Sequence, residues 1–179
     1  MHILESERLI LRPPRPSDIA AISVWLGDFE VAKNLSKVPH PYHEEDAEDF
    51  VAARGLQGNG HYSFVLTRKA DAVLVGCVGL HAEEAGVWEL GYWLGKPFWG
   101  QGLASEAARR VVLFAFEVLA LAELRSGWFF DNPASGHVLL KLGARHSGSR
   151  PRDCRARRGK VLCHEMRLTR ADFLRKEAA

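Results

Sequence analysis

The sequence of 179 residues contains only three cysteines, and their number and spacing exclude two common types of protein. Cys77, Cys154 and Cys163 form an odd set without the spacing of metal ligands. Neither a disulfide framework nor a cysteine metal site is therefore predicted. Free thiols are typical of a reducing compartment, so we expect a cytoplasmic protein that needs no metal.

A long hydrophobic run is also missing. The longest apolar stretch, Val111 to Leu121, is interrupted by Glu117 and is too short to span a bilayer. It therefore predicts a buried helix. Residues 1–8 have no apolar core of the kind found in signal peptides. These absences predict a protein without a membrane partner.

The excess of one charge sign is small, because the formal net charge is +2. No general attraction to nucleic acid is implied. With 47% hydrophobic residues, the chain has enough apolar surface for one core. Repeats, linkers and low-complexity segments are missing too, so we expect one domain over residues 1–179.

The apolar pattern predicts the order β-α-α-β-β-β-α-β-α-β-β, an α/β domain with a mixed sheet. A short polar tail is expected beyond residue 169. The expected strands span residues 8–12, 62–66, 73–80, 87–94, 124–130, 145–149 and 160–168, and the expected helices span 18–27, 44–54, 103–119 and 132–142.

The most informative segment is the glycine turn at residues 100–104, Gly-Gln-Gly-Leu-Ala, between an expected strand and an expected long helix. Free backbone N–H groups and the positive end of a helix dipole would face outward there, which suits a phosphorylated ligand. The turn lacks the third glycine of a dinucleotide-binding fingerprint and the Gly-Lys-Ser/Thr ending of a P-loop. Taken alone, it is equally typical of a tight connection that binds nothing.

The surrounding residues carry a family resemblance. Residues 92–107, YWLGKPFWGQGLASEA, resemble the acyl-CoA-binding motif of the GNAT N-acetyltransferases, and most closely the branch of ribosomal-protein N-terminal acetyltransferases. Residues 6–13 resemble the first strand of that branch. Residues 132–135 and 141–144 resemble its last helix, so the resemblance covers nearly the whole chain.

The resemblance implies a single-domain GNAT fold, with a mostly antiparallel mixed sheet, flanking helices and two splayed central strands. It implies acetyl-CoA as co-substrate, with its pantetheine arm between strands 87–94 and 124–130. Trp99 stands where the family motif often has Gln or Arg. The implied cofactor-binding residues are Trp93, Leu94, Trp99, Gly100, Gln101, Gly102, Leu103, Ala104, Ser105 and Asn132.

Glu89 lies within an otherwise apolar strand and is the first candidate catalytic residue. Burying an unpaired carboxylate is costly, so its presence needs a reason. It could be a general base for the acceptor amine, directly or through water. The alternatives are a charge on a solvent-facing side or a partner for an arginine. His81, at the end of the neighbouring strand, could assist deprotonation, but an ordinary strand-end histidine is the favoured interpretation.

Ser135 is the second candidate. Asn132 and Pro133 are typical of a helix start, which explains Asn132 without any ligand. Many GNAT enzymes carry a tyrosine on this helix that protonates the leaving thiolate, and Leu139 stands at that position here. The resemblance implies that Ser135 donates a hydrogen bond to the sulfur instead. A serine facing solvent is the alternative.

Seven basic residues and one acid, Asp153, occupy residues 145–160. A solvated, mobile loop is the favoured interpretation, and an anion-binding loop is the alternative.

The predicted function is an acetyl-CoA-dependent N-acetyltransferase that acts on a primary amine, either a peptide N-terminus or a small amine such as an aminoglycoside, a polyamine or an amino acid. An inactive acyl-CoA-sensing module is the second hypothesis, and a nucleic-acid binder using the arginine segment is the third and least favoured. Related proteins are often dimers, and the sequence leaves a homodimer open.

Overall fold

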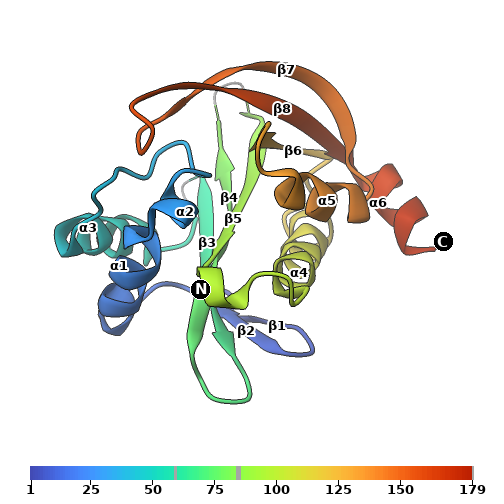
Figure 1. Ribbon diagram of the computed structural model, residues 1–179. Helices are drawn as coiled ribbons and strands as arrows, with labels where there is room; N and C mark the ends of the chain where they lie inside the picture. The colour runs from blue at the N-terminus through green and yellow to red at the C-terminus, as the bar shows by residue number, and fades with distance from the viewer. Residues whose placement is uncertain (59, 84–85, 179) are drawn as a thin grey trace.

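Eight strands form one sheet in the order β1-β2-β3-β4-β5-β6-β8-β7 in the computed structural model, which describes residues 1–58, 60–83 and 86–178 (Figure 1). The strands are β1 (Leu4–Glu5), β2 (Leu9–Arg12), β3 (His61–Arg68), β4 (Leu74–Ala82), β5 (Trp88–Leu94), β6 (Glu123–Phe129), β7 (Arg145–Cys154) and β8 (Gly159–Thr169). The helices are α1 (Ile19–Gly27), α2 (Phe29–Ala32), α3 (Glu44–Arg54), α4 (Leu103–Glu117), α5 (Pro133–Lys141) and α6 (Arg170–Glu177).

Strand pairing confirms the predicted mixed, mostly antiparallel sheet. Within the described residues, β5 and β6 are the one parallel pair, and every other neighbouring pair is antiparallel. Helices α1 to α3 lie on one side of the central strands and α4 and α5 lie on the other (Figure 1). None of the helices described is both long and apolar enough to cross a membrane.

Each face of the sheet has its own apolar cluster. The larger one packs α4 and α5 against the sheet and contains Phe64, Leu90 and Phe114. The smaller one lies under α1 and α3 and contains Ile22 and Val51. Two separately filled faces hold the central strands in place, so the opening between β5 and β6 lies in a rigid frame.

Helix α4 is amphipathic because its apolar residues recur at helical spacing. Leu103, Ala107, Val111 and Phe114 recur every three or four residues and are all buried. The helix starts after Gly102, whose φ of 78° is in the left-handed region. Its predicted start is therefore confirmed.

The structure corrects the expectation of a solvated, mobile loop at residues 145–160. Strand β7 extends to Cys154 and pairs with β8 as far as Gly159, so the segment is a long hairpin that curves over the ends of β4 and β5 (Figure 1). The strand continues through Pro151, which is compatible with a strand at the sheet edge.

The expected polar tail is also wrong, because residues 170–177 form helix α6. The hydroxyl oxygen of Thr169 accepts a hydrogen bond from the backbone N–H of Asp172 and caps the helix. Phe173 is buried and packs beside Phe116, with ring centroids 5.8 Å apart. One aromatic anchor among polar residues was too weak a pattern to indicate the helix.

Candidate active site

The opening between β5 and β6 has the splayed form that the sequence predicted. Among the described residues, Glu89 and Arg125 are the one registered pair of these strands. Beyond that pair, the hydroxyl of Ser126 donates to the carbonyl of Leu90 at 2.8 Å, which replaces a ladder bond by a side chain. From Gly91 onward, β5 pairs with β4 only. An unpaired edge inside a sheet can receive an extended ligand by backbone hydrogen bonds.

Two predicted cofactor-binding residues lie on this part of β5. Trp93 is opposite Cys77 in the β4–β5 ladder. Leu94 is buried, and its carbonyl accepts a hydrogen bond from the indole Nε1 of Trp99 at 2.8 Å. Trp99 therefore fastens the glycine turn to the end of β5.

The glycine turn presents main chain and keeps its side chains away. Gly100 and Gly102 have φ values of 73° and 78°, which L-residues with side chains rarely adopt. The side chain of Gln101 donates back to the carbonyl of Pro97 at 2.9 Å. Leu103 is buried, and α4 has no side-chain N-cap at Gly102, so the amides of its first turn remain available.

An ion pair that the sequence did not indicate holds this turn. The carboxylate of Glu106 accepts from the backbone N–H and the Nε of Arg8, each at 2.7 Å, and from the Ser6 hydroxyl. Arg8 also donates to the carbonyl of Gln101 at 2.9 Å. Burial raises the pKa of Glu106, but these hydrogen bonds outweigh it and leave the pKa below its usual value. Residues near the N-terminus thus fix the first turn of α4.

One connected cleft of about 1790 Å³ joins the turn to the opening in the sheet. From the glycine turn, the cleft continues past β5 to the segment before α3. The predicted residues that line it are Glu89, Trp93, Leu94, Trp99, Gly100, Gly102, Leu103, Ala104, Ser105, Asn132 and Ser135. Gln101 is the one predicted site residue that is not among those lining it.

Glu89 lies in this cleft as the partner of an arginine. Nη1 of Arg152, on β7, is 2.5 Å from its Oε1, and the side chains are 24% and 16% exposed for Arg152 and Glu89. Arg152 also lies 3.5 Å from Glu165. Arg152 is 63 residues from Glu89 in the sequence. The sequence therefore allowed an arginine partner as an alternative for Glu89 but could not indicate which arginine.

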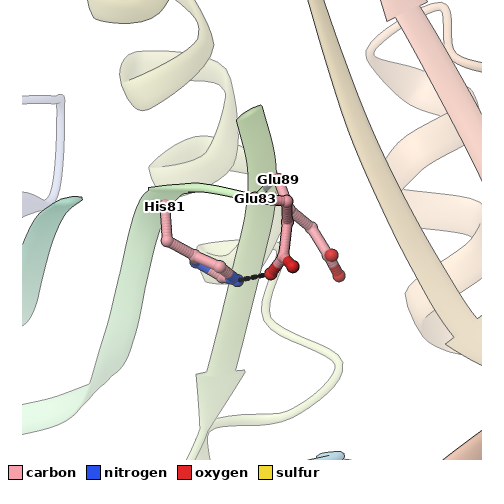
Figure 2. Close-up of side chains that lie close together, drawn as sticks. All are labelled: His81, Glu83 and Glu89. Atoms are coloured by element: carbon pink, nitrogen blue, oxygen red, sulfur yellow. Dashed lines mark ion pairs between the residues drawn. The ribbon is translucent and has the colours of Figure 1, made fainter. Parts of the chain in front are cut away.

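His81 on β4 lies directly opposite Glu89. Figure 2 shows the side chains of His81, Glu83 and Glu89 turned towards one another. Their ligand-type atoms all lie within 4.8 Å of each other. Burial lowers the pKa of His81 more than the neighbouring carboxylate of Glu89 raises it. The pKa of His81 therefore lies below its ordinary value.

Asn132 and Ser135 occupy the start of α5. The side-chain oxygen of Asn132 accepts from the backbone N–H of Ser135 at 3.4 Å, so the helix-capping role predicted for Asn132 is confirmed. Leu139, at the position of the missing tyrosine, is 1% exposed and belongs to the core. It takes no part in the cleft.

A tyrosine that sequence reasoning missed lies beside Ser135. The hydroxyl of Tyr92, on β5, is 2.9 Å from the Ser135 carbonyl oxygen and 3.0 Å from its Oγ. A carbonyl only accepts, so Tyr92 donates to it, and between the Tyr92 and Ser135 hydroxyls either can be the donor. Burial raises the pKa of Tyr92 and keeps it protonated. Its place in the predicted strand was the available signal, because β5 borders the opening.

Several arginines of the hairpin are engaged with specific partners. Besides Arg152, Arg150 pairs with Glu165 at 2.6 Å, and Arg157 contacts Asp131 through both terminal nitrogens at 2.7 and 3.0 Å. Nε of Arg157 also donates to the carbonyl of Lys33 at 2.8 Å. The hairpin therefore covers the cleft and connects its two walls.

The comparisons with known proteins agree with this geometry. The family model described as "Acetyltransferase (GNAT) domain" matches residues 8–145. The chain is 30% identical over 155 residues to the "Uncharacterized N-acetyltransferase YoaA" of Bacillus subtilis (strain 168), covering 82% of this chain and 84% of that protein.

Solved structures share the fold at low sequence identity. A RimL ribosomal L7/L12 alpha-N-protein acetyltransferase in complex with coenzyme A has a TM-score of 0.81 at 16% identity, covering 94% of this chain and 98% of that one. A spermidine N-acetyltransferase from Vibrio cholerae, in complex with CoA and spermine, has a TM-score of 0.79 at 18% identity, covering 93% and 98%. With the family match over most of its length, this chain belongs to the GNAT acetyltransferase family.

Proposed function

We propose that this protein transfers an acetyl group from acetyl-CoA to a primary amine, with a peptide N-terminal α-amine as the first acceptor to test. One observation carries the proposal: the uncapped N-terminus of α4 opens into the same cleft as the unpaired edge of β5 and the carboxylate of Glu89. A phosphate site, a slot for an extended arm and a polar group for the amine are thereby connected.

The residues at the turn fit a diphosphate. A Cβ built on Gly100 would meet no atom within 4 Å, so space above the turn is open. The amides of residues 100–105 would hold the diphosphate, because small residues let the backbone approach closely. The free edge of β5 near Trp93 and Leu94 would hold the pantetheine arm, with Asn132 beside it. Acetyl-CoA supplies an acetyl group that is activated as a thioester.

The side chains divide into an amine side and a thiol side. The polar cluster of His81, Glu83 and Glu89 would take up a proton from the amine. Ser135 would donate a hydrogen bond to the departing sulfur, and little acid assistance is needed because a thiol has a pKa of about 8.5. Tyr92 holds Ser135 in place at the mouth of the opening. The hairpin is held over the cleft by its ion pairs.

Thiol release tests the proposal. The protein is mixed with acetyl-CoA and a panel containing N-terminal peptides, a lysine side-chain analogue, a polyamine, an aminoglycoside and free amino acids. We expect acceptor-dependent release of free CoA and a mass increase of one acetyl group on one class of acceptor. CoA binding in calorimetry without turnover on any acceptor would favour the sensing module, which the burial of Leu139 in place of a tyrosine supports.

A further inference from the structure

We propose that Nε2 of His81 is the atom that accepts the proton from the acceptor amine, and that Glu89 is a fixed anion that supports it. This inference rests on the proposed acetyltransferase function and assigns the proton-accepting atom within the same cleft. It differs from the sequence-based prediction, in which the carboxylate of Glu89 is the base.

The carboxylate of Glu89 is already committed to Arg152. Oε1 lies 2.5 Å from the guanidinium, and both side chains are mostly buried. If Glu89 were protonated, Arg152 would keep its charge with only Glu165 at 3.5 Å to balance it. An uncompensated cation in a mostly buried position is costly. The carboxylate of Glu89 is therefore engaged by the guanidinium and is not free to face the amine.

His81, unlike Glu89, is partly exposed and is not engaged by a hydrogen-bond partner within the residues that the structure describes. Its side chain is 31% exposed and lines the cleft. The nearest carboxylate atom to Nε2 is Oε1 of Glu83, at 3.8 Å, which is too long for a hydrogen bond. Among the described residues, no hydrogen bond occupies the ring. The lone pair of a neutral imidazole there is open to the cleft.

The local structure explains why the ring can lie at this place. His81 and Glu89 are opposite each other in the β4–β5 ladder, so they share one face. A Cβ built on Gly91 would lie 3.5 Å from Cε1 of His81. This is an ordinary contact distance, so the imidazole lies directly against the strand that borders the opening.

Burial and the surrounding charges together set the pKa of His81. Burial has the largest effect and lowers its pKa. Glu89 and Glu83 raise the pKa, and Lys37 and Arg54 lower it. These groups come from β5, from the segments flanking β4 and α3, and from α3 itself. The net pKa lies below the ordinary value of about 6.5. Proton acceptance is favoured by Glu89, which stabilises the resulting imidazolium.

The same three side chains could be taken for a metal site, since their ligand atoms lie within 4.8 Å. Their charge, however, is already balanced by protein cations. Arg152 pairs with Glu89, and Nζ of Lys37 lies 3.7 Å from Glu83. A divalent ion would have to displace or repel both cations, so the arrangement favours a proton over a metal.

The proton balance is complete without another reactant. The bound ammonium loses one proton to Nε2 of His81, and the neutral amine nitrogen forms a bond to the acetyl carbon. The carbon–sulfur bond breaks, and sulfur takes the electron pair. The second proton of the nitrogen goes to sulfur, assisted by the hydroxyl of Ser135. His81 then releases its proton to water through the open cleft.

The experiment compares His81→Gln with wild type over pH 5 to 9, using two acceptors, a peptide α-amine with a pKa of about 7.8 and a lysine-type amine with a pKa of about 10.4. For wild type, kcat/KM should rise with pH to a plateau. The midpoint of this rise should lie below about pH 6.5 and should be the same for both acceptors. His81→Gln should lower kcat/KM at pH 7 by roughly 100-fold. The residual rate should follow the pKa of each amine.

Two variants separate the roles. In Glu89→Gln, kcat/KM should still rise with pH, but the midpoint of the rise should move to lower pH, because losing an anion disfavours the imidazolium. His146→Gln, an exposed histidine on β7 outside the cleft, is the matched control and should leave the profile unchanged. Added imidazole should restore part of the activity of His81→Ala, which a purely structural role would not allow.

A readout without turnover completes the test. The imidazole resonance of His81, assigned by its loss in His81→Gln, should titrate below about 6.5 in NMR and lower still in Glu89→Gln. An unchanged acid limb in His81→Gln, a His81 titration above pH 7, or activity that is lost with a chelator would overturn the inference. Each of those results leaves the acetyltransferase assignment standing, whereas absence of CoA binding and of thiol release would remove that assignment instead.

Discussion

The glycine turn and the β7–β8 hairpin border the same cleft, but they shape it by different means. The turn uses main-chain groups, with positive φ angles at Gly100 and Gly102 and an uncapped helix start. The hairpin uses charged side chains, which pair with residues such as Glu89 and Asp131 on other elements. A substitution in the turn should therefore affect cofactor binding, whereas one in the hairpin should affect how the walls are held together.

The largest effect is expected from charge at the turn. Gly100→Asp places a carboxylate in the open space above the turn, where the diphosphate would bind. At about 5 Å with an effective dielectric constant of about 20, each like-charge pair costs roughly 3 kcal/mol before screening. We expect the Kd for CoA to rise roughly 100-fold. Calorimetry measures the Kd, and thermal unfolding checks the fold.

Gly100→Asn is the matched control for that substitution. Asn and Asp have nearly the same shape and both tolerate the left-handed region better than other side chains. The Asn variant should raise the Kd only a few-fold, with a melting temperature close to that of the Asp variant. Equal affinities for the two variants would show that the diphosphate does not lie at this turn.

The same contrast explains what the sequence could predict. The turn, the start of α4 and the cap at Asn132 depend on neighbours within a few residues, so their patterns indicated them correctly. The splayed strands came from the family resemblance. The pairing of Glu89 with Arg152 joins residues 63 positions apart, and no local pattern encodes such a contact.

The errors at residues 145–160 and 170–177 have the same origin. Seven basic residues are typical of a solvated segment when their partners are unknown, but the structure supplies acids from β5, β8 and the start of α5. Helix α6 depends on Phe173 packing beside Phe116, a tertiary contact. Charge runs are thus poor indicators of disorder where distant acids can meet them.

A smaller effect is expected at the tip of the hairpin. Arg157→Lys keeps the charge but loses the two-pronged contact with Asp131 and the bond to the Lys33 carbonyl. We expect the free energy of unfolding in urea to fall by about 1–2 kcal/mol. Arg145→Lys, whose arginine is 66% exposed and pairs with Asp172, is the control and should lose less than about 0.5 kcal/mol.

The contribution of the Arg157–Asp131 pair to stability should depend on pH in a defined direction. The hydrogen bond from Arg157 lowers the pKa of Asp131, so its stabilisation is present above the unfolded value of about 3.9 and is lost as pH falls through the lower folded value. The stability difference between wild type and Asp131→Asn should be constant from pH 8 to 5 and shrink below about pH 4. Equal losses in Arg157→Lys and Arg145→Lys would contradict a fastened hairpin tip.

The smallest effect is expected at Tyr92, where the two walls of the cofactor opening meet. Tyr92→Phe removes the bond to the Ser135 carbonyl and frees the Ser135 hydroxyl to turn away from the sulfur. Because a neutral hydrogen bond contributes about 1 kcal/mol, kcat should fall about three- to fivefold with little change in KM for acetyl-CoA.

Tyr62→Phe is the matched control, since in the described part of the chain the Tyr62 hydroxyl has no hydrogen-bond partner and its ring packs on Phe114. It should leave kcat unchanged. In a Ser135→Ala background, Tyr92→Phe should lose most of its effect on kcat, because the hydroxyl that Tyr92 orients is no longer there. Additive losses from the two substitutions would instead mean that Tyr92 only braces β5 against α5, and that the thiol side of the cleft, like the turn, depends on backbone position alone.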